Sequence, residues 1–456
     1  MPSEVAINHL YKRAGFGPAP RWFIQSKLSD TLEDIVDSLL DDFVDVTRPT
    51  FLDDDIGDWE KEYMLKGWWM NRMAVDPDQG NPSAYKPLQE KLALFWHNHV
   101  ATENAKVGDM RLMWDQNNLF RTQGMGNFRQ LVHTMSLQPA MVIYLDNAYN
   151  HKYSPNENFI RELMELFTLG VNQYTQADIV AGARAWTGHN LDHDTDPDTY
   201  VFNSDAHDFG NKTFMGQTRN WDGPDIINYI LDENAQKRAV AARFITRKLW
   251  AWFAGSTPEN QMINELAQTF INNDLEIKPL LRAMFLRPEF YNSWARVGLV
   301  RTPIEWIVAI MKATGIPMLD QGDDQPHFNY WGIDEMGMDL FEPPNVAGWK
   351  NNGSWLGTTQ HWARASWIWN YRWMLHEAQF LEAEVLNVLL GSSTTKYRQA
   401  VNNALETFRV YFPTDNTHEM LLTWVKKQMQ ADGEWDHLAY YYMTQMVTLS
   451  PDFMMA

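Results

Sequence analysis

Cysteine is absent from the 456 residues of this chain. A chain without cysteine has no disulfide, no thiolate zinc site, no iron–sulfur cluster and no cysteine nucleophile. Cysteine usage therefore says nothing about the compartment. Residues 1–17 also lack the basic and then apolar pattern of a secretory signal. The sequence predicts a cytoplasmic protein, with the mature form of an exported protein as the alternative.

Clustered basic residues are missing as well. Asp and Glu outnumber Lys and Arg by 58 to 38, which gives a formal net charge of −20. Nucleic acids and anionic membrane surfaces attract clustered Lys and Arg, so neither is an expected partner. No run of about 18 apolar residues is present, so no membrane span is expected. Nothing in these patterns reports the oligomeric state.

Several common catalytic motifs are also absent. The chain has no G-x-x-x-x-G-K-[ST] phosphate loop, no G-x-G-x-x-G dinucleotide turn and no G-x-S-x-G nucleophile elbow. His376 and Glu377 begin a zincin motif, but Phe380 stands where the second histidine is required. These absences disfavour a kinase, a dehydrogenase, a serine hydrolase and a zincin.

An amphipathic helix over residues 156–170 is the clearest local pattern. Stepped at about 100° per residue, its apolar side chains fill one arc, formed by Phe159, Ile160, Leu163, Met164, Leu166 and Phe167. Gly170 follows where a left-handed cap would end the helix. Thr175 and Asp178 then have the spacing of a capping box that opens a second helix.

Similar helical patterns recur along the chain and predict an all-α protein. We expect one large multi-helix domain over residues 1–456, with long loops and at most a small β-hairpin near residues 198–217. Residues 360–456 could form a helical subdomain. Residues 191–223 are rich in Asp, Gly and Asn and form the longest expected loop, and long loops in compact domains are often functional.

The opposite arc of the 156–170 helix supplies the first candidate site, formed by Glu157, Arg161, Glu162 and Glu165. One interpretation is a solvated face with spaced ion pairs. The other is an acidic patch in a cleft, where a carboxylate acts as a base or a metal ligand. His207, Asp208 and Lys212 in the long loop either take part in acid–base chemistry or hold the loop in place.

Two further candidates lie outside these segments. His99 falls on the apolar face of an expected helix over residues 87–99, where it is either a core histidine or a ligand for a divalent metal ion. Trp349 and Trp355 lie in a Pro- and Gly-rich turn. They form either an exposed platform that binds a ligand or a plug in the core.

Several segments resemble one bacterial family, domain of unknown function 1800. The matching stretches are HLYKRAGFGP (9–18), LFWHNHVAT (94–102), QPAMVIYLDN (138–147), PNENFIRELMELFTLG (155–170), YTQADIVAGARAWTG (174–188), HDFGNKTFMG (207–216), PPNVAGW (343–349) and LSPDF (449–453). They are spread along nearly the whole chain. The resemblance implies a fold and a set of candidate residues but no reaction.

Three functional hypotheses follow. The first is an enzyme, a metal-assisted hydrolase or lyase acting on a polar, glycan-like substrate in a cleft between the 156–170 helix and the 191–223 loop. The second is a non-catalytic binding or assembly protein that uses a tryptophan-rich surface. The third holds that the marked residues are structural, with Arg161 buried among carboxylates.

Overall fold

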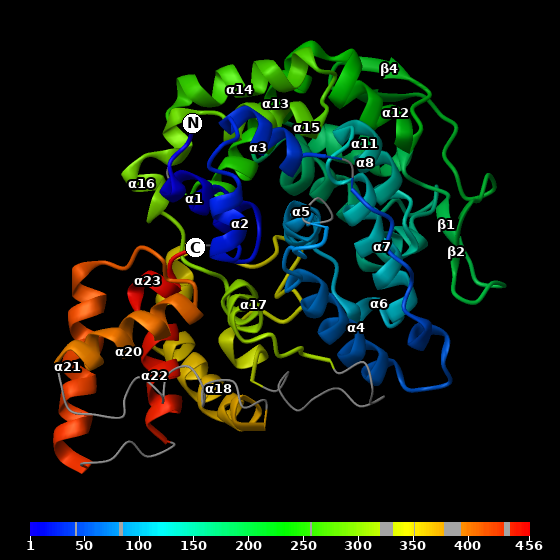
Figure 1. The fold of residues 1–456 in the computed structure, drawn as a ribbon. Helices are drawn as coiled ribbons and strands as arrows, with labels where there is room; N and C mark the ends of the chain where they lie inside the picture. Colours follow the sequence, from blue (N-terminus) through cyan, green and yellow to red (C-terminus); the bar gives the residue numbers. More distant parts are fainter. Residues whose placement is uncertain are drawn as a thin grey trace.

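The prediction of an all-α fold is confirmed by the computed structural model, which describes residues 1–41, 43–81, 85–255, 258–319, 332–350, 352–377, 394–432 and 438–456 (Figure 1). The first part of the chain forms α1 (Glu4–Ala14), α2 (Arg21–Ser26), α3 (Leu32–Leu39), α4 (Asp58–Met73), α5 (Pro87–His99), α6 (Asn104–Val107), α7 (Met110–Gln123), α8 (Phe128–Ser136), α9 (Pro139–Tyr144), α10 (Asn158–Glu162) and α11 (Gln176–Ala185). The second part forms α12 (Gly223–Asn228), α13 (Ala235–Phe253), α14 (Asn260–Asn272), α15 (Ile277–Phe285), α16 (Ser293–Arg296), α17 (Pro303–Thr314), α18 (Thr358–Glu377), α20 (Thr394–Thr407), α21 (Asp415–Asp432), α22 (Leu438–Thr448) and α23 (Pro451–Met454).

Short 3-10 and π segments connect these helices. The 3-10 segments are η1 (Thr50–Asp53), η3 (Asn147–Tyr149), η6 (Pro288–Tyr291), η8 (Asp334–Met336) and η9 (Asn352–Leu356), and the π segments are η4 (Leu163–Thr168) and η5 (Tyr229–Glu233). None of the described helices is both long and apolar enough to cross a bilayer.

The long loop contains two small antiparallel hairpins where the sequence predicted at most one. Strand β1 (His189–Asp192) pairs with β2 (Thr199–Phe202), and β3 (Lys212–Phe214) pairs with β4 (Gln217–Arg219). The strands were under-predicted because they have only three or four residues each, too few for an alternating pattern to stand out. Figure 1 shows the β1–β2 hairpin at the edge of the molecule.

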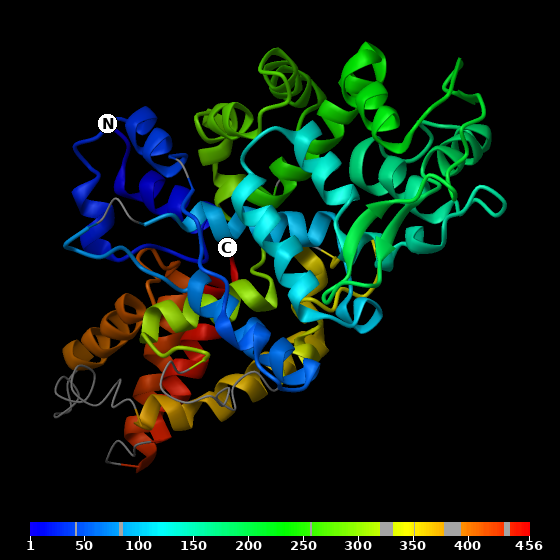
Figure 2. The ribbon, with the colours of Figure 1, turned by 90° about the vertical axis from the view of Figure 1, so that its right-hand side faces the viewer.

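Helix α5 lies at the centre of the fold in both ribbon views (Figures 1 and 2). All of its residues are buried, including charged ones. Glu90 is compensated by Arg121, with 2.8 Å between Oε1 and Nε, and by Arg72 at 3.1 Å. A buried charge is tolerated only when it is paired in this way. This central helix fixes the position of the residues that follow it.

The 156–170 segment folds as α10 followed directly by η4. The apolar arc is buried except for Leu166, which is partly buried, and Gly170 has φ +85° in the left-handed region. The capping box of Thr175 and Asp178 is also confirmed. Thr168 is also buried, although a regular helix of about 100° per residue would place it on the polar arc. The i to i−5 hydrogen bond from Leu169 N to Met164 O explains this, since a π turn rotates the residues that follow it.

The carboxy-terminal helices α18 and α20–α23 gather at one corner of the molecule (Figure 1). The end of the chain returns to the segment between α16 and α17. Arg301 N donates to Met454 O at 2.9 Å, and Ala456 N donates to Leu299 O at 2.8 Å. Whether residues 360–456 form a subdomain of the single predicted domain stays a prediction.

Candidate functional site: a cluster of carboxylates

Three consecutive residues at the end of α5 hold two other segments of the chain. Phe341 N donates to His97 Nε2 at 3.1 Å, and Trp349 N donates to the Asn98 side chain at 2.7 Å. The ring of His99 donates from Nε2 to the carbonyl of Phe167 at 3.1 Å. The end of α5 therefore brings the π turn of the 156–170 segment and the 341–349 turn to the same place.

Beside this junction four glutamates interact electrostatically: the charges of Glu103, Glu162 and Glu342 act on Tyr144, and those of Glu62 and Glu103 act on Glu342. We call the side chains of Glu62, Glu103, Glu162 and Glu342 the carboxylate cluster. They come from α4, from the residue before α6, from the end of α10 and from the 341–349 turn. Burial, and then the charges of Glu103, Glu162 and Glu342, raise the pKa of Tyr144 to about 12. Segments far apart in the sequence thus place acidic groups together.

Glu342 has the most perturbed carboxyl group of this cluster. Burial, and then the charge of Glu62, raise its pKa to about 7, although an N–H bond from Ala105 and the charge of Lys66 lower it. Glu62 is compensated, because it contacts Lys66 Nζ at 2.6 Å and accepts from Asn104 Nδ2 at 2.8 Å. The two carboxyl groups therefore lie in different environments.

Glu162 belongs to the same cluster and was a candidate from the sequence. Burial, and then Glu165, raise its pKa, and Arg161 partly offsets them. Glu165 accepts a hydrogen bond from the hydroxyl of Tyr174. The π segment begins at the next residue, Leu163, and π turns of this kind are frequent at functional sites.

Glu157 and Arg161 lie on the other side, in solvent. Their side chains are 38% and 37% exposed and pair at 2.8 Å, and both contact Gln176. This is the solvated ion pair that the sequence left open as one alternative. The third hypothesis, in which Arg161 is buried among carboxylates, is wrong in its placement of that residue.

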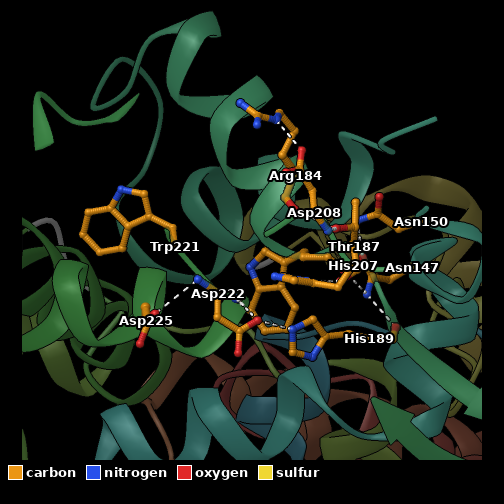
Figure 3. Close-up of polar contacts among 12 residues, drawn as sticks. Asn147, Asn150, Arg184, Thr187, His189, His207, Asp208, Trp221, Asp222 and Asp225 are labelled. Atoms are coloured by element: carbon orange, nitrogen blue, oxygen red, sulfur yellow. Dashed lines mark hydrogen bonds and ion pairs between the residues drawn. The ribbon is translucent and has the colours of Figure 1, made fainter. Parts of the chain in front are cut away.

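His207, Asp208 and Lys212 form a separate cluster in the long loop, and Figure 3 labels His207 and Asp208. His207 Nδ1 donates to the Thr187 carbonyl at 2.7 Å, and Asp208 pairs with Arg184 at 2.7 Å. Lys212 donates to the carbonyls of Asp208 and of Trp221, the latter at 2.8 Å. Three of these four bonds end on backbone carbonyls, which is the pattern of residues that hold a loop in place.

The same loop contains a chain of hydrogen bonds that the sequence analysis missed. His189 is buried, and its Nε2 lies 2.8 Å from a carboxylate oxygen of Asp222, as Figure 3 shows. Its Nδ1 lies 2.9 Å from the hydroxyl of Tyr200 across the β1–β2 hairpin. Burial, and then Asp222, raise the pKa of Tyr200 to about 12. The arrangement fixes both ring nitrogens of His189 and ties the hairpin to α12.

The predicted cleft between the helix and the loop stays a prediction, but its candidate residues contact different parts of α11. Glu157 and Arg161 contact Gln176 at the start of α11, whereas Asp208 contacts Arg184 near its end. Eight residues of α-helix separate these contacts by about 12 Å along the axis. Residues 197–200 of the loop do line a cavity of about 460 Å³, but its other walls are α7 and residues 134–139. The candidate residues of the helix and those of the loop therefore lie in two separate places.

His99 is enclosed by aromatic rings. It stacks on Phe95 with 5.7 Å between ring centroids and lies 6.1 Å from Phe244. Burial lowers its pKa to about 3. These contacts favour the core histidine over the metal ligand. Among the described residues, no three His, Asp or Glu side chains lie close enough together to hold a metal ion.

Trp349 and Trp355 are each only 4% exposed and belong to the hydrophobic core. An exposed platform formed by these two rings is therefore wrong, and the core plug is the alternative that the structure shows. The ring of Trp349 lies 5.4 Å from His97, and its backbone is held by Asn98. Gly348, with φ +75°, passes so close to Asn98 that a Cβ would lie 2.1 Å from its carbonyl oxygen.

Glu62, Glu103, Tyr144 and Glu342 could not be recognised directly from the sequence. A partial signal was present, because Tyr144 lies within a segment that carries the family resemblance, and Glu103 and Glu342 stand one residue after or before such a segment. Their convergence depends on contacts between residues more than 200 positions apart, such as Asn104 N to Phe341 O at 2.8 Å.

Comparison with known proteins gives one finding. No curated protein and no solved structure matches the chain. One family model does match, described as "Protein of unknown function (DUF1800)", and the match covers residues 9–455. It spans almost the whole chain, including every residue of the carboxylate cluster. The chain therefore belongs to the DUF1800 family.

Proposed function

We propose that this protein is an enzyme that performs acid–base chemistry at the carboxylate cluster, with a polar, glycan-like molecule as substrate. The observation that carries the proposal is the pair of Glu342 and Glu62, two neighbouring carboxyl groups in different environments. Burial and Glu62 raise the pKa of Glu342 to about 7. Pairs of this kind supply an acid and a base at the same pH.

The two groups have distinct roles in this proposal. Glu342, protonated near neutral pH, donates a proton to the leaving oxygen of the substrate. Glu62, oriented by Lys66 and Asn104, supplies the carboxylate that activates water or attacks the substrate directly. Glycoside hydrolysis uses two carboxyl groups in these roles, which is why a glycan is the substrate class that we favour.

The test is an activity screen with matched variants. The purified protein is incubated with a panel of soluble polysaccharides, and new reducing ends are measured. For a cleaved substrate we expect Glu342→Gln to lower kcat by about 10²–10⁴-fold, because it removes the general acid. The rate should fall as the pH rises through about 7, where Glu342 loses its proton.

Glu335→Gln is the control, because Glu335 is exposed and lies only seven residues before Glu342. Its rate should equal that of the wild type. Equal rates for Glu342→Gln and the wild type would overturn the role of Glu342. Cleavage of none of the glycans would overturn the substrate class.

The alternative is a binding or assembly protein that uses exposed tryptophans. Trp349 and Trp355 do not supply such a surface, but Trp294 is 77% exposed and borders a pocket of about 470 Å³. An aromatic ring at the edge of a pocket suits a sugar or a partner side chain. Loss of glycan binding in Trp294→Ala, with all glutamate variants unchanged, would favour this alternative.

A further inference from the structure

Another cavity lies on a different part of the molecule, where the two ends of the chain meet. It has a volume of about 350 Å³ and lies between α1, the residues around α16, and the segments 409–414 and 452–455. Its charged and titratable lining residues are His9, Lys12, Arg296, Arg301, Arg409 and Asp452. Cationic groups dominate this wall in a chain whose net charge is −20.

Arg301 is the central residue of this wall. It is only 3% exposed, and none of the residues that the structure describes pairs with its guanidinium or accepts a hydrogen bond from it. The ring of Phe453 lies 4.5 Å from its guanidinium carbon. An arginine stays charged in proteins, and a buried charge needs a compensating group. Nothing described supplies that group.

Two neighbouring cations, Arg13 and Lys12, add to this positive charge. Arg13 is 1% exposed and donates only to the carbonyl of Ala295, so its Nε and Nη1 have no described partner. Lys12 lines the cavity, and burial followed by the charges of Arg301 and Arg13 holds its pKa well below the usual range. Burial and Arg13 also lower the pKa of Arg301, to about 9. A bound negative charge would reverse all of these shifts.

The carboxylates nearby are already engaged. Asp452, which faces Lys12, accepts hydrogen bonds from the backbone and the hydroxyl of Thr414 at 2.7 and 2.9 Å. Asp76 is paired with Arg409 and lies 3.5 Å from Lys312. Behind Arg13, Glu305 pairs with Lys91. Arg296 adds to the excess of positive charge. Burial, then Arg13 and Lys12, and last Arg296 lower the pKa of His9 to about 2.

We propose that this cavity binds a small organic anion, whose carboxylate or phosphate group contacts Arg301 and Lys12. The lining also includes four apolar residues, Val5, Val297, Val410 and Met455. It suits a ligand with a short apolar body rather than an inorganic ion alone. Guanidinium and ammonium groups bind both kinds of oxyanion through charge-assisted hydrogen bonds. The site is independent of the carboxylate cluster and of the reaction proposed there.

The experiment is a binding titration of the full chain at low ionic strength. Inorganic phosphate and propionate are the two probes, and sodium chloride at equal ionic strength is the reference. We expect one probe to raise the melting temperature above the reference and to show saturable binding by calorimetry. The probe that binds more tightly identifies the headgroup.

Lys12→Met is the informative variant, because Lys12 is less deeply buried than Arg301. It should weaken binding by about tenfold or more, the effect of losing one charge-assisted contact. Lys27→Met is the control, since it removes the same charge from a lysine that pairs with Asp30 outside the cavity. Unchanged affinity in Lys12→Met, or no effect of either probe beyond sodium chloride on the wild type, would overturn the proposal.

Discussion

The loop around His189 and His207 and the carboxylate cluster are both rich in titratable groups, but their charges are balanced in different ways. In the loop, Asp208 pairs with Arg184, Asp222 pairs with His189, and Lys212 donates hydrogen bonds to backbone carbonyls. In the cluster, Glu62 and Glu342 share Lys66 as a nearby cation, and Arg161 acts on Glu162. The first arrangement stabilises a loop, whereas the second keeps one carboxyl group protonated near neutral pH.

This difference separates structural from functional polar clusters better than residue type does. Histidine beside aspartate has the composition of an acid–base site, yet in the loop each group already has its partner. Glutamates on four separate segments have no motif, yet their mutual repulsion is the kind of environment that enzymes use to shift pKa values. The comparison can be tested by removing one group at a time.

The largest effect on stability is expected in the loop. His207→Ala removes the hydrogen bond to Thr187 and the packing against Phe209, whose ring lies 4.6 Å away. We expect the free energy of unfolding to fall by about 2–4 kcal/mol, from the unpaired carbonyl and the lost side-chain volume. Urea denaturation measures it.

His193→Ala is the matched control, because its ring is 70% exposed. Its free energy of unfolding should stay within about 0.5 kcal/mol of the wild type. Wild-type stability in His207→Ala together with a lost activity would contradict the structural role of the loop and would make it the catalytic centre instead.

A smaller effect of opposite sign is expected at Glu342. Its pKa is raised to about 7 in the folded state, so the folded protein binds a proton that the unfolded chain releases between about 4.5 and 7. The stability that this proton gives is present below pH 4.5 and is lost as the pH rises through about 7. Glu342→Gln keeps a neutral group at every pH.

The variant should therefore gain stability relative to the wild type on going from pH 5 to pH 8, by about 1–2 kcal/mol after allowance for solvent screening. Urea denaturation of both proteins at the two pH values measures this difference. A difference that does not depend on pH would contradict the raised pKa. A variant that is more stable but inactive would show that the cluster is kept for function.

Glu62→Gln should affect the same group indirectly. Removing this negative charge should lower the pKa of Glu342 toward its usual value, because the charge of Glu62 is the largest cause of the shift after burial. Carbon-13 NMR of labelled glutamate carboxyls follows the titration. Glu335→Gln again serves as the control and should leave the titration unchanged. An unaltered titration in Glu62→Gln would show that burial alone raises the pKa.

Local features of the fold could be predicted from the sequence, because they depend on neighbouring residues. Gly170 and the Thr175–Asp178 box are set by the chemistry of a few adjacent positions, and both are confirmed. The buried position of Thr168 was missed, because an ideal wheel assumes 100° per residue throughout. A π turn breaks that regularity, and it follows from tertiary packing rather than from local pattern.

The candidate site could be predicted only in part, for the same reason. Glu162 was marked by its place on an amphipathic helix, but Glu62 and Glu342 lie 100 positions before it and 180 after it. Glu342 joins the cluster because His97 and Asn98, at the end of α5, each bind the 341–349 turn. The burial of Trp349 could not be predicted either, because a Pro- and Gly-rich turn is typical of both buried and exposed loops.

The smallest expected effect concerns Arg161, which was a candidate residue in the sequence and also acts on Glu162 of the carboxylate cluster. Its pair with Glu157 is more than one third exposed on both sides. Such pairs contribute about 0.2–0.5 kcal/mol on a helix, and salt screens them. We expect the coupling energy from a double-mutant cycle of Glu157→Gln and Arg161→Gln to lie in this range and to vanish in 1 M sodium chloride. Because Arg161 also lowers the pKa of Glu162, the single variant Arg161→Gln should raise that pKa further while leaving stability almost unchanged. A coupling of several kcal/mol would instead place this pair in the same buried class as Glu90 and Arg121.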